Sequence, residues 1–364
     1  MSKTRAREGD FVETSDGLFF DVKGLVHPRD RIIAYLRYYP HSRGARLRQG
    51  KRYAKVYDLI QRNRLLRDKW PQYLYYDDMQ GRQLQGVPKA SVLRLHKPEL
   101  RLISLLNSRH KDVLENRAAK LVTILSREFE LPLASFGVSG SVLVGLHRPE
   151  SDIDIVVYGT NAARRVREAM LALLEQDKQF HRYSAHGLKK IYLKRALQNA
   201  IRFNDFVKQE QRKVLQGDFL DSDYFIRCVK DWQEVTESYG DVRYRPMGRC
   251  GISAEISDDT ESLLSPCRYS LERVHVFAGK ASLKPQEVVS FRGRFAEQVR
   301  VGERVIAQGR LETVQCRESH YCRLVVGEAR TDILKGTNQV SSRPSAASYG
   351  KSSPVSLFSR DVLH

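Results

Sequence analysis

The sequence has few of the features that mark exported, membrane-spanning or metal-clustered proteins. It contains only five cysteines in 364 residues, and none of them belongs to a Cys-x-x-Cys pair. This usage predicts neither a disulfide framework nor a zinc ribbon, and it fits a reducing compartment. The charged N-terminus has no apolar stretch behind it, and nowhere do about 18 apolar residues run together, which argues against a signal peptide and a membrane span. We therefore expect a cytoplasmic protein that does not associate with membranes.

Acidic residues are too few to balance the basic ones. Lysine and arginine number 62 against 43 aspartates and glutamates, which gives a formal net charge of +19. Such an excess attracts phosphate, so RNA or DNA is a candidate partner. For any single basic cluster, a solvated surface is the other explanation. The hydrophobic content of 41% is enough for sizeable cores, and the length fits two or three folded units.

The first segment, residues 1–96, is predicted to be rich in β-structure. Alternating apolar residues at 10–14 and 18–23 flank the turn signal Ser15-Asp16-Gly17, and this pattern predicts a hairpin. Tyrosines and basic residues then interleave from 29 to 75. This mixture suits either a small core whose tyrosine hydroxyl groups reach solvent or a surface on which nucleic-acid bases stack. We favour the core.

The second segment, residues 97–240, is predicted to combine helices and strands. Helical spacing of apolar residues over 97–129 indicates one or two amphipathic helices. Short apolar runs at 131–139 and 152–158 indicate two strands, with the first turn of a helix around 142–146 between them. Further helices are expected over residues 160–176, 188–200, 203–215 and 223–236.

The third segment, residues 241–335, changes to short strands punctuated by glycines, which predicts a small β-barrel or sandwich. The strands are expected at residues 242–245, 250–256, 273–277, 287–295, 303–312 and 321–326. The remaining residues, 336–364, are rich in serine and poor in large apolar residues, so we expect a disordered tail there.

The most informative stretch joins Gly140 and Ser141 to Asp152 and Asp154. In a strand, residues two apart point to the same side, so the two carboxylates converge while the residues between them face the core. Two such acids repel each other, and a bound divalent cation offsets the free-energy cost of this repulsion. Mg²⁺ or Mn²⁺ held there can bridge the phosphates of a nucleoside triphosphate. Gly140 lets the backbone approach a phosphate, and Ser141 offers it a hydroxyl donor.

Gly-Ser followed by a spacer and then by Asp-x-Asp between apolar residues resembles the signature of the DNA polymerase β-type nucleotidyltransferase superfamily. The resemblance covers residues 136–158. It implies an α+β nucleotidyltransferase core in which Gly140 and Ser141 lie between a strand and a helix. It also implies that Asp152 and Asp154 are catalytic metal ligands on the next strand.

The superfamily has a third carboxylate on a later strand, between apolar neighbours. Glu255 lies between Ala254 and Ile256 and fits that local rule, so the resemblance assigns it to the catalytic metal site with the other two acids. The rivals for this role are Asp258, Asp259 and Asp205.

The rest of the chain resembles uncharacterised, predicted nucleotidyltransferases of archaea and bacteria. The similar segments are residues 16–28, with the sequence DGLFFDVKGLVHP, and residues 290–295, with the sequence SFRGRF. This resemblance brings no substrate with it.

Further residues are candidates for contacts with phosphates. Four basic residues belong to the helix expected over 188–200, namely Lys189, Lys190, Lys194 and Arg195. They reach a triphosphate only if that helix lies beside the site. Those in the C-terminal β unit are candidates for binding an acceptor nucleic acid: Arg292, Arg294 and Arg300. An exposed basic face is the competing explanation for each set. His147, between the two halves of the motif, contacts either the nucleotide or the protein surface.

We therefore hypothesise an α+β nucleotidyltransferase core with helical additions and a C-terminal small β-barrel or sandwich. It would move a nucleoside monophosphate from a nucleoside triphosphate, ATP or another, to a hydroxyl acceptor and release pyrophosphate. The basic charge favours RNA as the acceptor, while the base, the acceptor and the oligomeric state stay open. One alternative is a nucleic-acid-binding protein that keeps the fold without catalysis. Another is an enzyme that modifies a partner protein.

Overall fold

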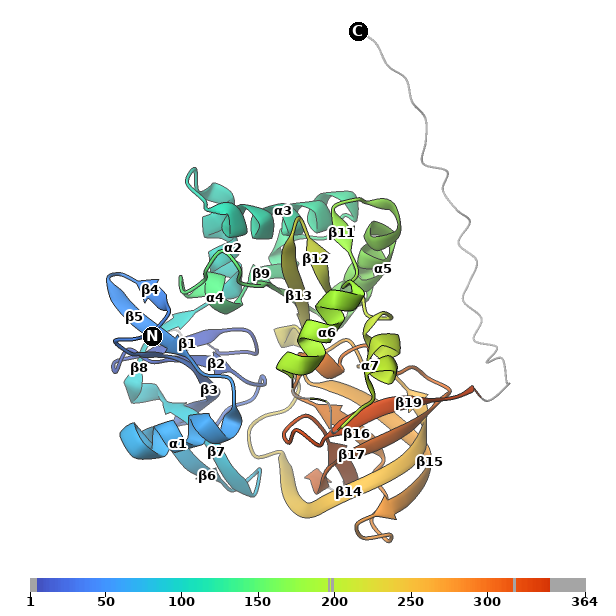
Figure 1. Cartoon of the computed structure of the whole chain (residues 1–364). Helices are drawn as coiled ribbons and strands as arrows, with labels where there is room; N and C mark the ends of the chain where they lie inside the picture. The colour runs from blue at the N-terminus through green and yellow to red at the C-terminus, as the bar shows by residue number, and fades with distance from the viewer. Residues whose placement is uncertain (1–4, 196, 198–199, 317–318, 341–364) are drawn as a thin grey trace.

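The structure, a computed structural model, describes residues 5–195, 197, 200–316 and 319–340. Its strands form three sheets, and each sheet contributes to a hydrophobic core of its own. The first sheet is blue in Figure 1, the strands of the second are green to yellow, and the third is orange to red. The sheets follow one another along the chain, and helices accompany the first two, which gives a mixed α+β architecture.

The first sheet packs around buried aromatic residues. It contains β1 (Phe11–Thr14), β2 (Phe19–Val22), β3 (Arg31–Pro40), β4 (Arg46–Arg48), β5 (Lys51–Lys55), β6 (Leu74–Asp77), β7 (Arg82–Pro88) and β8 (Val92–His96), with helix α1 (Leu59–Lys69) and the 3-10 turns η1 (Pro71–Tyr73) and η2 (Lys89–Ser91). Strands β1 and β2 pair antiparallel and form the predicted hairpin. Tyr38, Tyr53 and Tyr73 are buried, so their interpretation as core residues is confirmed.

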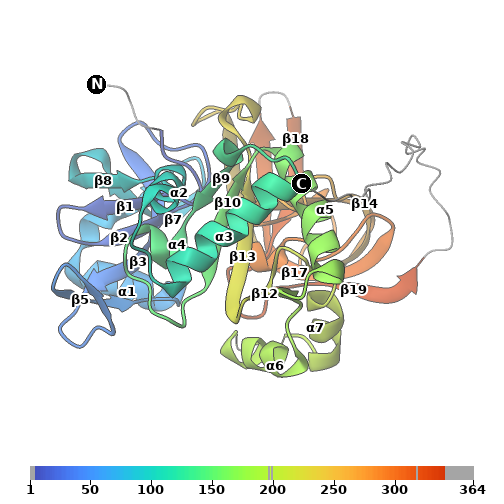
Figure 2. The ribbon, with the colours of Figure 1, turned by 90° about the horizontal axis from the view of Figure 1, so that it is seen from above.

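The second sheet places two parallel strands at its centre. Its elements are α2 (Pro98–Asn107), α3 (Val113–Glu128), η3 (Leu133–Ser135), β9 (Phe136–Val138), α4 (Gly140–Leu143), β10 (Ile153–Tyr158), α5 (Thr160–Gln176), β11 (Phe180–His181), α6 (Ala185–Lys194), α7 (Phe203–Glu210), β12 (Gln216–Phe219), β13 (Ser222–Val229) and η4 (Trp232–Glu234). The strand order is β11-β12-β13-β10-β9, and β10 runs parallel to β13. Helices α3 and α5 share one core with β10 and β13 (Figure 2).

The prediction of a helix over 223–236 is wrong, because β13 occupies its first half. Tyr224, Ile226 and Cys228 are buried and alternate with more exposed residues, which is the period of a strand. Pairs of apolar residues four apart, Tyr224 with Cys228 and Phe225 with Val229, also satisfy helical spacing, so periodicity alone does not distinguish a strand from a helix here. Parallel pairing with β10 makes this segment a strand, and a pairing between distant segments cannot be recognised from the local sequence. The helix expected over 203–215 likewise ends early, at Glu210.

The third sheet curls into a partial ring. It contains β14 (Val242–Asp258), β15 (Cys267–Ala278), β16 (Glu287–Ser290), β17 (Glu303–Cys316), β18 (Ser319–Val325) and β19 (Ile333–Val340), with the 3-10 turn η5 (Gly293–Phe295). Because β14 pairs with both β15 and β17, the order β14-β15-β16-β18-β17 returns to its first strand. The expectation of a β-rich C-terminal unit is thus confirmed as a partial ring of strands.

Several strand boundaries in this region differ from the predictions; for example, the strand expected over 287–295 ends at Ser290 and the one expected over 273–277 begins at Cys267. The strands expected at 242–245 and 250–256 are one strand, β14, whose pairing with β17 shifts between Pro246 and Arg249. Residues 336–340, which we assigned to a disordered tail, belong to β19, because backbone pairing with β17 needs no large apolar side chains. Residues 341–364 lie outside the described residues. Among the helices of the described residues, none combines the length and the apolar character needed to span a bilayer.

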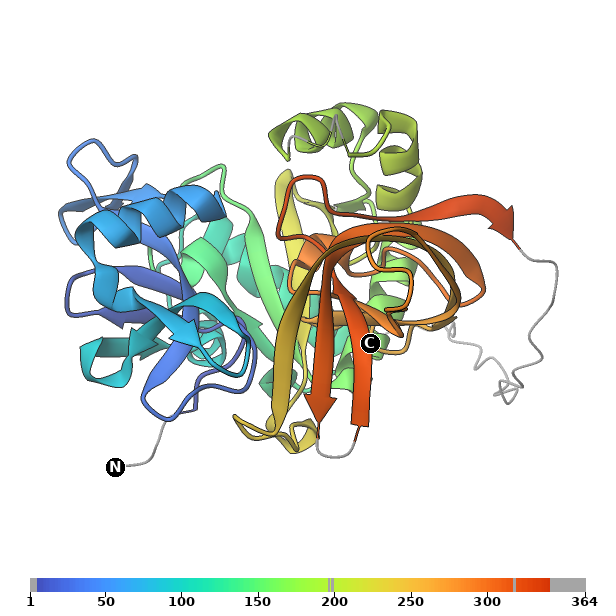
Figure 3. The ribbon, with the colours of Figure 1, turned by 90° about the horizontal axis from the view of Figure 1, so that it is seen from below.

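The first sheet contacts both of the other sheets. Its buried Phe11, Tyr38 and Tyr53 share a core with the residues that follow Gly140 and Ser141, namely Leu143, Val144 and Leu146. On its other side, the Arg82 guanidinium pairs with Glu328 of the third sheet at 2.6 Å. In Figure 3 the first sheet and the C-terminal ring lie on either side of the second sheet. Side chains from the first sheet can therefore reach sites on both neighbours.

Candidate active site

Strand β10 separates its side chains onto two faces. Ile153, Ile155 and Val157 are buried in the core beneath α3 and α5. Asp154 points to the opposite face, and Asp152, which directly precedes the strand, lies on that face as well. The two acids predicted to converge therefore lie on one side of the sheet.

Asp154 is largely buried, and this changes its acidity. Burial first, and then the charge of Asp152, raise the pKa of the Asp154 carboxyl to about 6. The positive charges of Arg227, Lys55 and Arg37 act in the other direction. The carboxylate thus lies in a strained electrostatic position, with a negative neighbour and three cations around it.

Gly140 is required by the close approach of Asp154. The Gly140 backbone has φ +61°, and a Cβ added there would lie 1.8 Å from Asp154 Oδ2. The backbone also joins the two elements, because the Ser139 N–H donates to the Asp154 carbonyl at 2.8 Å. Ser141 follows in α4 and is buried. The helical turn expected around 142–146 is α4, which is too short to supply a long helix dipole to a phosphate.

The first sheet supplies cations to this place, which local sequence patterns did not predict. A small cavity of about 40 Å³ at Asp154 is lined also by Arg37 of β3, Lys55 of β5, Arg227 of β13 and Asp21 of β2. Burial and the neighbouring Arg37 lower the pKa of the Lys55 ammonium. Asp21 and Arg227 are neutralised locally, because Asp21 pairs with Lys23 at 2.9 Å and Arg227 pairs with Glu8 at 2.7 Å. Among the described residues, Arg37 and Lys55 have no carboxylate partner within 4.0 Å.

A third carboxylate lies beside the pair, on β13. Ile153 is opposite Tyr224 in the parallel register, so Asp152 lies beside Asp223 one step earlier. Burial and then the charge of Asp152 raise the pKa of Asp223. The signal that could have identified Asp223 is the alternation of 222–229, had that segment been interpreted as a strand.

The structure does not bring Glu255 to these acids. It lies on β14 of the third sheet, where its carboxylate pairs with Arg273 at 2.7 Å. Of its rivals, Asp258 accepts a hydrogen bond from the Thr260 N–H at 3.1 Å, and Asp205 lies 3.8 Å from Lys335. An acid between apolar neighbours occurs on many strands, so the local rule could not identify the strand that lies beside β10.

The helix α6 lies beside the site, as two of its basic residues show. The charges of Lys190 and Lys194 act on Asp223 and oppose the rise in its pKa. Arg195, by contrast, pairs with Glu210 at 3.3 Å. The His147 Nε2–H donates to the Asp112 carboxylate at 2.6 Å, so in this structure His147 contacts the protein surface.

The donor set around Asp154 fits a divalent cation. The charge of Asp152 raises the pKa values of both Asp154 and Asp223, and Mg²⁺ or Mn²⁺ relieves such an excess of negative charge. A separate cluster of possible metal ligands is closer together. Within the described chain, the ligand atoms of Asp112, Glu115 and His147 lie within 4.8 Å of one another. That cluster has another explanation, because Asp112 and Glu115 form the capping box of α3.

Comparison with known proteins adds two findings. A family model described as the nucleotidyltransferase domain matches residues 118–217, a range that contains Gly140, Ser141, Asp152 and Asp154 and ends before Asp223. An uncharacterised protein of Methanocaldococcus jannaschii is 32% identical over 336 residues, which cover 90% of this chain and 96% of that protein. No solved structure matches the chain significantly.

The contact between Gly140 and Asp154 predicts a selective loss of stability. Gly145 has a φ of +63° and an added Cβ would meet nothing closer than 4.0 Å, so Gly145→Ala reports backbone strain alone. We expect that variant to lose roughly 1–2 kcal/mol in the free energy of unfolding. Gly140→Ala must also displace Asp154 and should lose roughly 1–3 kcal/mol more. Urea unfolding measures both, and equal losses would show that the two groups are not in contact.

The burial of Asp154 predicts a stability difference that depends on pH. The pKa is raised from 3.8 to about 6, so this carboxyl stabilises the fold fully below pH 3.8 and loses that contribution as the pH rises through about 6. Asp154→Asn should therefore stabilise the metal-free protein at pH 8 by roughly 1–3 kcal/mol, and by less toward pH 4. Denaturant unfolding across this pH range measures the effect. Asp68→Asn, at an exposed position of α1, is the control, and an equal gain from it would contradict the prediction.

Proposed function

The chain belongs to the DNA polymerase β-type nucleotidyltransferase superfamily, and we propose that it transfers a nucleoside monophosphate from a nucleoside triphosphate to a hydroxyl acceptor. The observation that carries the proposal is the contact of Gly140 with Asp154 beside Asp152. One element offers backbone and a hydroxyl to a phosphate, and the other offers acids to a cation. The contact between Gly140 and Asp154 supports a combined site for a phosphate and a cation.

Each residue of the proposed site has a separate role. Asp152, Asp154 and Asp223 would hold Mg²⁺ or Mn²⁺, which neutralises phosphate charge and activates the acceptor oxygen when it is bound. Ser141 would donate its hydroxyl to a phosphate oxygen.

Lys55 and Arg37 would stabilise the negative charge of the triphosphate. Both lack a carboxylate partner among the described residues, and both line the cavity at Asp154. A buried ammonium whose pKa is lowered binds an anion with particular advantage, because the anion restores the solvation that burial removed. The first sheet would thus act as part of the nucleotide site.

The transfer itself is an in-line displacement at the α-phosphorus. The acceptor oxygen forms a bond to that phosphorus as the bond to pyrophosphate breaks, and the hydroxyl proton leaves to a carboxylate. Asp223 is exposed, lies beside Asp152 and has a raised pKa, so it is suited to receive that proton. We propose Asp223, in place of Glu255, as the third carboxylate.

The proposal is tested by incorporation of label from each α-labelled nucleoside triphosphate in turn, with Mg²⁺ or Mn²⁺ and total cellular RNA. Wild type should transfer label to RNA, and the double variant Asp152→Asn with Asp154→Asn should be slower by at least about 100-fold. Asp68→Asn controls for the change in charge.

Three outcomes would contradict this function in different ways. A double variant as fast as wild type removes the assigned site. Label on polypeptide alone replaces RNA by a protein acceptor. No incorporation together with tight retention of RNA supports a binding protein without catalysis, a class that the net charge of +19 also suits.

The assignment of the third acid predicts opposite results for two variants. Asp223→Asn should reduce kcat in the same assay by at least about 100-fold, because it removes a carboxylate beside Asp152. Glu255→Gln should stay within about threefold of wild type, because it alters only a pair with Arg273, whose side chain is 61% exposed. Circular dichroism checks that both variants fold. Loss of activity in Glu255→Gln alone would restore the original assignment.

A further inference from the structure

A second and larger cavity lies between the first sheet and the C-terminal ring. It has a volume of about 300 Å³, within the range of sites that hold nucleotide-sized ligands. From the first sheet it is lined by Tyr35 and nearby residues, and from α1 by Arg62. From the ring it is lined by Val289, Phe291 and Arg292. Basic and aromatic side chains thus meet across it.

The connectivity of the ring indicates which of its faces the cavity uses. Numbered from β14, the order of pairing is 1-2-3-5-4-1, and the third and fifth strands, β16 and β18, are parallel. This is the connectivity of the OB-fold, whose second and third strands carry the binding face for oligonucleotides and oligosaccharides. The equivalent strands here are β15 and β16.

That face is the one that borders the cavity. Tyr269 and Val288 point into the core of the ring, whereas their neighbours Arg268 and Val289 line the cavity. Arg323, on the strand β18 beside β16, lines it too. Connectivity alone does not establish a function, and the charges in the cavity provide the further evidence.

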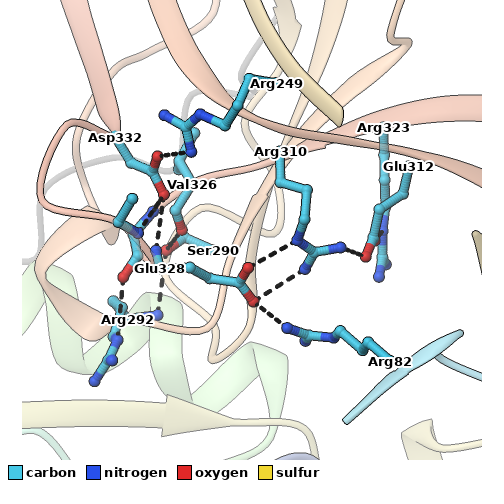
Figure 4. Close-up of polar contacts among 12 residues, drawn as sticks. Arg82, Arg249, Ser290, Arg292, Arg310, Glu312, Arg323, Val326, Glu328 and Asp332 are labelled. Atoms are coloured by element: carbon cyan, nitrogen blue, oxygen red, sulfur yellow. Dashed lines mark hydrogen bonds and ion pairs between the residues drawn. The ribbon is translucent and has the colours of Figure 1, made fainter. Parts of the chain in front are cut away.

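Most of the cations in the cavity are committed to carboxylates of the protein. Arg82 pairs with Glu328, which also binds Arg310, and Figure 4 shows this glutamate between the two guanidiniums. Other cations of the cavity are also paired: Arg323 with Glu312 at 2.8 Å, Lys230 with Glu261 at 2.5 Å, Arg268 with Glu287 at 3.1 Å and Lys23 with Glu8 at 2.9 Å. These pairs hold the walls together and leave little charge for a ligand.

Two guanidiniums are different, because neither Arg62 nor Arg292 has a carboxylate within 4.0 Å among the described residues. Arg62 is only 3% exposed and donates to the Val56 carbonyl at 3.1 Å. Burial and the neighbouring Arg37 and Arg292 lower the pKa of Arg62. Leaving a buried cation unpaired is costly, so its retention indicates an external anion.

The loop after β18 positions Arg292. Asp332 accepts hydrogen bonds from the backbone N–H groups of Gly327, Glu328 and Ala329, at 2.8 to 3.0 Å (Figure 4). The Gly327 carbonyl then accepts from Arg292 Nε at 3.3 Å. The guanidinium is therefore held in place before any ligand arrives.

Electrostatic interactions link the unpaired cations to the proposed catalytic acid. Arg292 and Arg37 both act electrostatically on Arg62, and Arg37 acts on Asp154. Tyr35 lies two residues before Arg37 on β3 and also lines the cavity. Arg37 at the cavity of Asp154 thus interacts electrostatically with Arg62, and Arg62 with Arg292, at the larger cavity.

We propose that the larger cavity binds the acceptor as a single-stranded oligonucleotide, with backbone phosphates on Arg62 and Arg292 and a base stacked on Tyr35 or Phe291. The proposal rests on the proposed function, because the strand would bring its terminal hydroxyl toward Asp154. Aromatic rings among cations bind single strands of many sequences, since every base offers a ring face. A duplex hides those faces, so it should bind more weakly.

Fluorescence anisotropy tests the proposal on the full chain carrying Asp154→Asn, so that catalysis does not interfere. The probes are a fluorescein-labelled single-stranded RNA of about 10 nucleotides, the same DNA sequence, and the RNA annealed to its complement. We expect both single strands to bind, and comparison of the RNA with the DNA shows whether the site distinguishes ribose from deoxyribose. The duplex should bind roughly 10-fold more weakly.

Variants of Arg292 give the site-specific readout. Arg292→Gln should weaken single-strand binding by roughly 10-fold and lower the slope of log affinity against log salt by about 0.7, the value for one phosphate contact. Arg292→Lys keeps the charge and should retain the slope. Arg164→Gln removes the same charge from an exposed position of α5 and should change neither quantity.

The outcomes separate this inference from the function on which it rests. No binding of either single strand, equal binding of the duplex, or an unchanged salt slope in Arg292→Gln overturns the inference. If label from nucleoside triphosphates still enters RNA in that case, the transfer proposal survives alone. Binding that depends on Arg292 without any incorporation supports the cavity and contradicts the transfer.

Discussion

The candidate site depends on the burial of one carboxylate, Asp154, against the backbone of Gly140. A carboxylate in that position cannot be solvated freely, and Asp152 adds a second negative charge beside it. Ordinary packing would replace such a group by an apolar residue, as it does at Ile153 and Ile155 on the other face of the same strand. The fold instead surrounds Asp154 with cations from three different strands. A buried acid with this environment is arranged for a ligand rather than for stability.

The packing of the first sheet against the second produces this arrangement. The first sheet packs Phe11 and Tyr38 against the turn after Gly140, and the same packing brings Arg37 and Lys55 to Asp154. The ring is tied to the first sheet by the pair of Arg82 with Glu328, and this contact closes the larger cavity. The nucleotidyltransferase sheet supplies acids, and its neighbours supply most of the positive charge.

The sequence predicted the parts of the site that depend on neighbouring residues in the chain. Alternation along a strand places Asp152 and Asp154 on one face, and a glycine before a serine indicates a close approach of backbone, so both follow from local rules. The proposed third acid does not, because Asp223 becomes a neighbour of Asp152 only through parallel pairing of strands far apart in the sequence. Glu255 satisfied the local rule and lies on another sheet.

The same distinction applies to charge. A net charge of +19 indicates a polyanionic partner without locating it, since most basic residues of the larger cavity are matched by carboxylates. Only the ion pairs of the folded chain reveal which cations are left over, and Arg62 cannot be recognised from its position in an ordinary amphipathic helix. Its burial without an anion is informative because it is unfavourable in the free protein. The unpaired cations therefore locate the ligand, and the paired ones explain how the walls of the cavity are held in place to receive it.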